Sequence, residues 1–151
     1  MLGAVTALQQ TFGDIQIDAA ESRQVAVGIQ RLQARRDEGA LGDTVIVHLG
    51  NNGTFTDQQF DALMAILGDV PRVAFVNDKV PRVWEGPNDA VIAAGVQRYS
   101  NTILVDWREA SGSQPSFFWN DGIHLRPAGA QAYADLLDQV LTSSETSATP
   151  Q

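Results

Sequence analysis

The segment of residues 120–127 places an aspartate and a histidine three positions apart, with a glycine between them. In an Asp-x-x-His turn, the Asp121 carboxylate can accept a hydrogen bond from the Nδ1–H of His124. That bond fixes the ring tautomer and leaves Nε2 free to take a proton from a nucleophile. A plainer interpretation is that Asp121 caps the helix that Pro127 opens and that His124 is only nearby. Both interpretations stay open on these residues alone.

A second polar turn, Gly50-Asn51-Asn52-Gly53, follows an apolar, β-branched run at residues 44–49. At a strand end, backbone N–H groups and the side-chain amide of Asn52 suit the oxyanion that forms during acyl transfer. A Gly/Asn turn that only meets positive φ angles is the simpler alternative for the same residues. His48 lies inside the apolar run, which favours a hydrogen-bonded core residue over a catalytic base.

Alternating strands and helices would position these two turns. Period-two and β-branched runs predict strands at residues 15–19, 44–49, 72–77 and 102–107. Apolar spacing and capping signals predict helices at residues 1–12, 22–38, 56–68, 87–99 and 127–141, with Ser22 as one N-cap and Thr56 with Gln59 as a capping box. The order predicts an α/β fold with a mostly parallel sheet, in which functional groups gather at the carboxyl ends of strands. Since both turns follow strands, we expect them to share one crevice.

Composition indicates one globular domain and argues against several partner classes. The chain has 151 residues, 44% of them hydrophobic and 19% charged. Its net charge of −8 argues against a nucleic-acid partner. With no cysteine and only scattered acidic residues (Asp57, Asp61, Asp69, Asp78 and Asp89), no metal site is predicted.

The sequence predicts one domain over residues 1–141 and a disordered tail of Ser, Thr, Glu and Pro over residues 142–151. No apolar run approaches the roughly 20 residues needed to span a bilayer, and no signal peptide opens the sequence. No Gly-rich strand-to-helix loop or P-loop lysine supports nucleotide binding.

His48-Leu49-Gly50-Asn51-Asn52-Gly53, followed by Asp121-Gly122-Ile123-His124-Leu125, resembles the SGNH (GDSL-like) hydrolase and acyltransferase family. Residues 19–24, 80–85 and 105–107 look like one subgroup, the extracytoplasmic SGNH domains fused to membrane-embedded O-acyltransferases that acetylate bacterial cell-envelope glycans. The likeness runs from Met1 to about Leu141. It implies a flavodoxin-like, three-layer α/β/α fold, an extracytoplasmic location at the cell envelope, and chemistry that needs no metal or organic cofactor.

The resemblance also implies roles for single residues. His124 would be the general base and Asp121 the residue that orients it. Asn52 would donate its side-chain amide to the oxyanion, beside the turn at Gly50. The family uses a glycine backbone N–H as another oxyanion donor, and Ser22 stands at the matching place in this sequence.

Arg82 and Trp84 are implied to shape the acceptor site, with a salt bridge and a core aromatic as the alternative interpretation. The implied partners are an acyl donor, a carbohydrate acceptor and, in the parent protein, a membrane-embedded acyltransferase domain.

The family's nucleophile is a serine in a Gly-Asp-Ser turn directly after the first strand. Met1-Leu2-Gly3-Ala4 resembles the residues that follow this turn, so we expect a sheet without its first strand and a chain that is inactive or nearly so alone. That strand would lie between residues 15–19 and 44–49 in the sheet. No internal serine stands in a strand-turn-helix elbow aimed at His124; those considered are Ser22, Ser111, Ser113 and Ser116.

The leading hypothesis is an SGNH-type O-acyltransferase or acyl-esterase domain that acts on acylated cell-envelope glycans through a Ser-His-Asp mechanism. The alternative is a non-catalytic glycan-binding or interaction module that kept the cleft of this fold.

Overall fold

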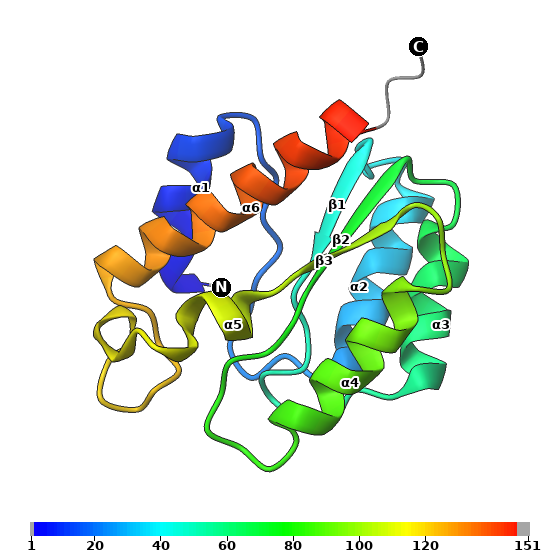
Figure 1. The fold of residues 1–151 in the computed structure, drawn as a ribbon. Coiled ribbons are helices and arrows are strands. Elements are labelled where there is room, and N and C mark those ends of the chain that lie inside the picture. The colour runs from blue at the N-terminus through cyan, green and yellow to red at the C-terminus, as the bar shows by residue number, and fades with distance from the viewer. Residues whose placement is uncertain (1, 148–151) are drawn as a thin grey trace. The chain divides into compact units, whose positions relative to one another are not determined.

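The computed structural model describes residues 2–147, which divide into two compact units (Figure 1). The first unit joins the residues up to Glu21 to those from Trp107 onward, and the second runs from Ser22 to Asp106. The second unit holds the sheet, whereas the first is helical. Asp121 and His124 therefore belong to the first unit, and the turn of residues 50–53 belongs to the second.

The sheet of the second unit contains three parallel strands in the order β1-β2-β3. They are β1 (Thr44–Val47), β2 (Arg72–Val76) and β3 (Thr102–Val105). Val45 pairs with Val73 across the first ladder, and Ala74 pairs with Ile103 across the second. Because the strands are parallel, the residues that follow all three strands lie at the same end of the sheet. The predicted parallel α/β sheet is confirmed for these strands.

In the second unit, α2 (Val25–Asp37) precedes β1, α3 (Asp57–Leu67) connects β1 to β2, and α4 (Glu85–Val96) connects β2 to β3. The predicted capping box at the start of α3 is confirmed. Thr56 Oγ1 accepts a hydrogen bond from the Gln59 backbone N–H at 3.2 Å, and Gln59 Oε1 accepts one from the Thr56 N–H at 3.0 Å. Pro87 lies in the first turn of α4, as predicted, where its missing N–H has no intrahelical partner to lose.

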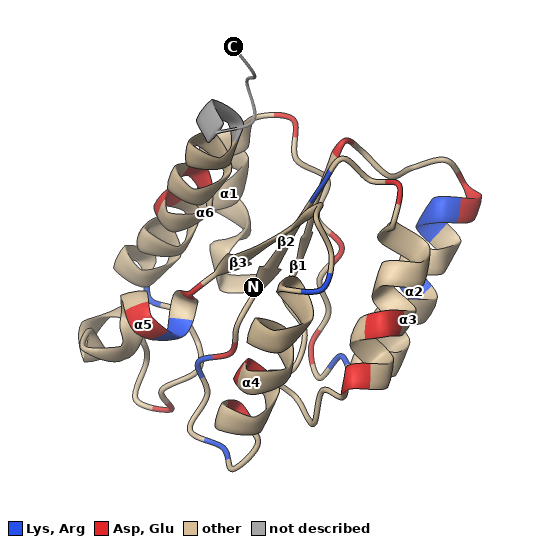
Figure 2. Cartoon of the chain, turned by 45° about the vertical axis from the view of Figure 1, so that its right-hand side comes forward, with Lys and Arg blue, Asp and Glu red and all other residues tan. Residues whose placement is uncertain are grey.

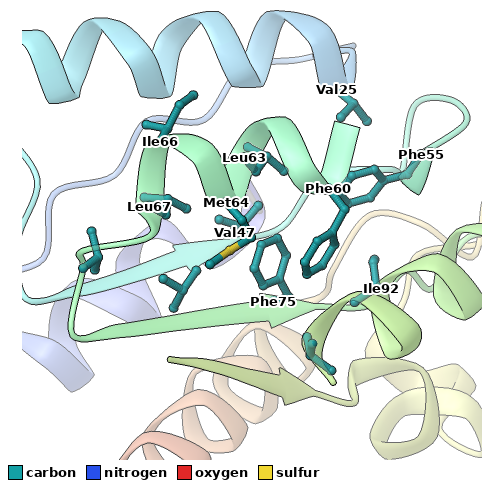
Figure 3. Close-up of a cluster of buried hydrophobic side chains, with 13 residues drawn as sticks. Val25, Val47, Phe55, Phe60, Leu63, Met64, Ile66, Leu67, Phe75 and Ile92 are labelled. Atoms are coloured by element: carbon teal, nitrogen blue, oxygen red, sulfur yellow. The ribbon is translucent and has the colours of Figure 1, made fainter. Parts of the chain in front are cut away.

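A hydrophobic core joins these helices to the sheet (Figure 3). Phe60 of α3 stacks on Phe75 of β2 with ring centroids 4.3 Å apart, and both side chains are fully buried. Gly95 of α4 lets this ring approach, since a Cβ there would lie 2.5 Å from Phe60. Burial of a side chain of this size contributes about 1.5–3 kcal/mol. The core thus fixes α3 against the sheet, and with it the turn that leads from β1 into α3.

The first unit is built from helices: η1 (Leu2–Ala4), α1 (Val5–Phe12), α5 (Trp107–Gly112), η2 (Pro115–Phe117) and α6 (Pro127–Ser147). Trp107 packs edge-on against Tyr133 of α6, with ring centroids 5.2 Å apart, and both side chains are buried. Gly129 leaves no room for a Cβ against the Phe117 carbonyl. The segment between η2 and α6, which contains Asp121 and His124, therefore starts and ends on tightly packed residues.

Two predictions near the start of the chain are wrong. Residues 15–19 form no strand, because none of the described strands pairs with them, and alternation alone cannot satisfy a strand's backbone groups. Ser22 is not the N-cap of α2, which begins at Val25 after Gln24. A capping residue needs an extended backbone, and Ser22 has a left-handed one with φ of +52°.

Later boundaries also differ from the prediction. The predicted loop of residues 108–120 contains α5 and η2, and Trp107 opens α5 instead of ending a strand. Its carbonyl accepts the hydroxyl of buried Ser111, one helical turn on. α6 continues to Ser147, past the predicted end at Leu141, and residues 148–151 of the predicted tail lie outside the described residues. No helix in the described part of the chain is long and apolar enough to cross a membrane.

Candidate active site

Asp121 and His124 form the hydrogen bond that their spacing predicts. Asp121 Oδ2 lies 2.8 Å from His124 Nδ1, and since a carboxylate only accepts, the ring carries its proton on Nδ1. Asp121 Oδ1 accepts the backbone N–H groups of Ile123 at 2.8 Å and His124 at 2.9 Å. The His124 side chain is 78% exposed, so Nε2 is open to an incoming group. This arrangement can act as a base, and the plain capping interpretation does not account for it.

The three hydrogen bonds that the Asp121 carboxylate accepts also favour its ionised form. The bond to the His124 ring and the two backbone N–H groups together lower the pKa of Asp121 to about 2. Asp121 therefore stays ionised at neutral pH and remains an acceptor for the His124 Nδ1–H. An ionised Asp121 also stabilises the imidazolium that forms when Nε2 takes a proton.

The Asp–His turn is the tip of a short antiparallel hairpin. Gly122 adopts a φ of +68°, which favours glycine, and its N–H donates to the Trp119 carbonyl at 2.9 Å. The Trp119 N–H donates to the His124 carbonyl at 2.8 Å, and Phe118 and Leu125 form an antiparallel bridge. The backbone hydrogen bonds of the hairpin thus hold Asp121 and His124 in place.

The turn of residues 50–53 is closed by its own backbone, with the Gly53 N–H donating to the Gly50 carbonyl at 3.2 Å. The Asn52 carbonyl accepts from Gln24 Nε2 at 2.7 Å. Asn52 Nδ2 lies 3.4 Å from the Arg23 carbonyl, which is a long and weak contact. The backbone of Asn52 is therefore held firmly, while its side-chain amide can exchange this contact for a stronger acceptor.

Asn88, which sequence reasoning missed, holds both ends of this turn. It is buried, its Oδ1 accepts the Phe55 N–H at 2.7 Å, and its Nδ2 reaches the carbonyls of Gly50 at 3.1 Å and Gly53 at 2.9 Å. Because the N–H only donates and the carbonyls only accept, the orientation of the amide is unambiguous. Nδ2 also lies 2.9 Å from Asp78 Oδ2, so the same side chain ties the turn to the end of β2.

Asp78 is fully buried beside this amide, and its backbone N–H donates to Asp89 Oδ1 at 2.8 Å. Burial raises the pKa of Asp78 to about 7, despite the hydrogen bond from Asn88, which lowers it. Gly50, with φ of +121°, leaves no room for a Cβ against the Asp78 carboxylate. Sequence reasoning gave Asp78 no role at the site. Its position directly after a buried strand could have indicated one, because the residues that follow parallel strands lie at the same end of the sheet.

A side-chain hydrogen bond links Asn51, in the turn of residues 50–53, to His48, which directly follows β1. Asn51 Nδ2 lies 3.2 Å from His48 Nε2, and burial lowers the pKa of His48 to about 3. His48 is therefore neutral near pH 7 and hydrogen-bonded, in agreement with the core interpretation of its sequence position.

The structure brings neither Arg82 nor Trp84 into a buried cluster. Arg82 is exposed, and its guanidinium donates to the neighbouring Pro81 carbonyl at 3.1 Å. Trp84 precedes α4 and is half-buried, with an indole N–H that is shielded from solvent and has no hydrogen-bond partner among residues 2–147. Their role at an acceptor site stays a prediction, as does the backbone N–H of Ser22 as an oxyanion donor.

Ser111 is buried with its hydroxyl bonded to the Trp107 carbonyl, which removes it as a nucleophile. In the described part of the chain, no serine hydroxyl is hydrogen-bonded to the His124 ring. His124 and Asn52 lie in different units, so the crevice that they are predicted to share stays a prediction.

No described group of three or more His, Cys, Asp or Glu side chains could hold a metal ion.

Comparisons with known proteins point to one group of relatives, although no family model matches the chain. The O-acetyltransferase OatA of Staphylococcus aureus is 36% identical over 132 residues, 87% of this chain. The peptidoglycan O-acetyltransferase OatA of Listeria monocytogenes is 34% identical over 141 residues, 93% of this chain. The chain spans 22% of the length of each of these relatives.

Among solved structures, the chain is similar to the C-terminal catalytic domain of Streptococcus pneumoniae peptidoglycan O-acetyltransferase A. The TM-score is 0.83 at 19% identity, over 96% of this chain and 89% of that chain. The chain therefore has the α/β fold of that domain.

Proposed function

The chain belongs to the SGNH (GDSL-like) hydrolase and acyltransferase family, and on this premise we propose that it is an acyl-transfer domain acting on a cell-envelope glycan. The observation that carries the proposal is the Asp121 carboxylate, which fixes the His124 ring with Nδ1–H directed at it and Nε2 exposed. That is the arrangement a general base needs to activate a hydroxyl.

The proposed reaction has two steps. A serine hydroxyl attacks the carbonyl of an acyl donor while His124 Nε2 takes its proton, and the proton then passes to the leaving alcohol as the acyl-serine forms. A carbohydrate hydroxyl, or water, next gives its proton to Nε2 and attacks the acyl-serine; Nε2 returns this proton to the serine oxygen as the acyl–oxygen bond breaks. The Asn52 amide and the backbone N–H groups near Gly50 and Ser22 would stabilise the oxyanion of both tetrahedral intermediates.

The serine itself is proposed to come from a Gly-Asp-Ser turn that precedes the residues of this chain. The family resemblance supports this, because residues 1–4 resemble those that follow the turn. The same resemblance, with relatives several times longer than this chain, supports a membrane-embedded acyltransferase domain as partner and an extracytoplasmic location.

An ester-hydrolysis burst with p-nitrophenyl acetate tests the proposal. The 151-residue chain is expected to show no burst and no labelling by a serine-directed phosphonate, whereas a form with a strand ending in Gly-Asp-Ser-Val ahead of Met1 should show both. In the extended form, His124→Ala should abolish the burst and Asp121→Asn should weaken it through the wrong tautomer. Asn52→Ala should cost on the order of 10²-fold in rate.

A matched control is the same extension ending in Gly-Asp-Ala-Val, which should restore neither signal. Labelling of the unextended chain at an internal serine would overturn the assignment of the nucleophile. An extended form that is folded but inert toward esters would overturn the catalytic proposal and favour the glycan-binding module.

A further inference from the structure

Trp119 is a large aromatic side chain that the fold leaves uncovered beside His124. It is 53% exposed, although the two other tryptophans are more covered: Trp107 is buried and Trp84 is half-buried. Its backbone is fixed on both sides, because its N–H donates to the His124 carbonyl and its carbonyl accepts from the Gly122 N–H. Trp119 is thus an exposed ring on an ordered backbone.

Arg126 holds the ring in a defined orientation. Its guanidinium carbon lies 4.7 Å from the centroid of the Trp119 ring, which is cation–π distance. Arg126 Nε is shielded from solvent and has no hydrogen-bond partner among the described residues, so packing against the indole helps to hold this group. With Arg126 on one face, the indole is preorganised, and its remaining surface is open to a flat ligand.

The hairpin register places Trp119 next to the proposed base. Phe118 is bridged to Leu125, so Trp119 lies opposite His124, and Arg126 lies two residues further along the same strand. Residues opposite each other in an antiparallel pair, and their diagonal neighbours, project to the same side. The contact between Arg126 and Trp119 agrees with this register.

We propose that Trp119, supported by Arg126, is a stacking platform for a pyranose ring of the glycan acceptor. The apolar C–H face of a pyranose matches the indole surface, and ring hydroxyls at its rim would then lie toward His124. This inference rests on the proposed function for the identity of the ligand, but sugar binding itself requires no serine and no acyl transfer. Trp119 would act by positioning the acceptor, and its loss would weaken binding without changing the Asp121–His124 pair.

Titration of the 151-residue chain with chitotetraose, an N-acetylglucosamine oligomer, tests the platform by ¹H–¹⁵N NMR of the indole N–H signals. The Trp119 signal should shift with saturation, and that of buried Trp107 should not. Trp119→Ala should weaken binding about 3- to 10-fold, as expected for loss of one aromatic contact, and Trp119→Phe should retain part of it. Arg126→Met should give an intermediate loss.

Val27→Ala is the matched control, because Val27 of α2 is an exposed hydrophobic side chain (46%) that lies outside the hairpin and outside the residues assigned to the site. Its affinity should equal that of the unchanged chain. Absence of chitotetraose binding, or equal affinity after Trp119→Ala, would overturn the inference. So would a Trp119 signal that moves with protein concentration alone, which would assign the ring to self-association. Ester hydrolysis by the serine-extended form is scored separately, so the function and the platform can fail independently.

Discussion

At the scale of single residues, the Asp121 carboxylate positions His124, the proposed base, through bonds to both its ring and its backbone. Asp121 uses Oδ1 to hold the turn, through two backbone N–H groups, and Oδ2 to hold the His124 ring. Asp121→Asn would keep the size of this side chain but would replace one acceptor oxygen with a donor. The bond to the Nδ1–H or the bonds to the turn would be lost, which is why this substitution should impair the base without removing it.

Ser22 carries backbone strain that glycine would relieve. It is exposed and left-handed, with φ of +52°, where a Cβ costs on the order of 1 kcal/mol. Ser22→Gly is therefore expected to raise the free energy of unfolding by roughly 0.5 kcal/mol, after the greater flexibility of glycine in the unfolded chain is counted. Urea unfolding measures the change, and Ser22→Ala, which keeps the Cβ, should bring no gain. A loss of stability in Ser22→Gly would show that the hydroxyl matters more than the backbone angle.

Asp78 should make stability depend on pH below neutrality. Burial raises the pKa of Asp78 to about 7 in the folded state, against about 3.9 in an unfolded chain. Between these values the folded state holds a proton that the unfolded state releases, so the free energy of unfolding should fall as pH rises from about 4 to 7. The slope from this group is at most about 1.4 kcal/mol per pH unit.

Urea unfolding at a series of pH values measures this slope. Asp78→Asn, which cannot ionise, should flatten the curve and gain its largest advantage above pH 7. Asp69→Asn serves as the control, since Asp69 is an exposed partner of Arg36. An unchanged slope in Asp78→Asn would refute the assignment.

At the scale of elements, the end of β1 is held by a residue of α4. Asn88 bonds three backbone groups of the segment between β1 and α3, and its bonds to Phe55 and Gly50 are buried. α3 carries surface ion pairs instead, such as Arg98 with Asp61 at 2.8 Å. Acidic positions along this helix are red in Figure 2. Exposed pairs of this kind contribute about 0–1 kcal/mol, so the buried amide is the stronger constraint.

Asn88→Ala should therefore cost about 1–3 kcal/mol of unfolding free energy, because it leaves the buried Phe55 N–H without its acceptor and removes a donor from the Gly50 and Gly53 carbonyls. Amide hydrogen exchange at Gly53 and Phe55 should speed up more than elsewhere in the second unit. Asn101→Ala is the matched control, since Asn101 bonds the carbonyls of Leu67 and Val70 at the other end of α3. Equal exchange changes in both variants would mean general destabilisation and would contradict a specific hold on the turn.

At the scale of the whole molecule, the sheet has an open edge. β1 pairs only with β2 among the described strands, so its other side presents backbone N–H and C=O groups without a ladder partner. Such an edge favours pairing with another chain. The 151-residue polypeptide is expected to self-associate in a concentration-dependent way, which light scattering after size exclusion measures.

The form extended by a strand ending in Gly-Asp-Ser-Val is the control and should be monomeric, because the added strand can pair with β1. A monomeric 151-residue chain with ordinary stability and cooperative unfolding would contradict this expectation.

The sequence alone identified what short-range interactions decide. The capping box of Thr56 and Gln59 and the bond between Asp121 and His124 each join residues three positions apart. The three strands were equally clear from their apolar runs, although only β2 is buried along most of its length, whereas β1 and β3 are largely half-buried. The family resemblance rested mainly on the motifs at residues 48–53 and 121–125 and agrees with the relatives found.

Only the tertiary structure revealed how distant residues support the site. Asn88 reaches Gly50 across 38 positions, and Asp78 changes its pKa because packing removes it from water. No spacing rule predicts such partners, since the chain path decides which buried polar groups meet. Residues 15–19 show the converse: their alternation favoured a strand, but a strand exists only where a neighbouring one completes its hydrogen bonds.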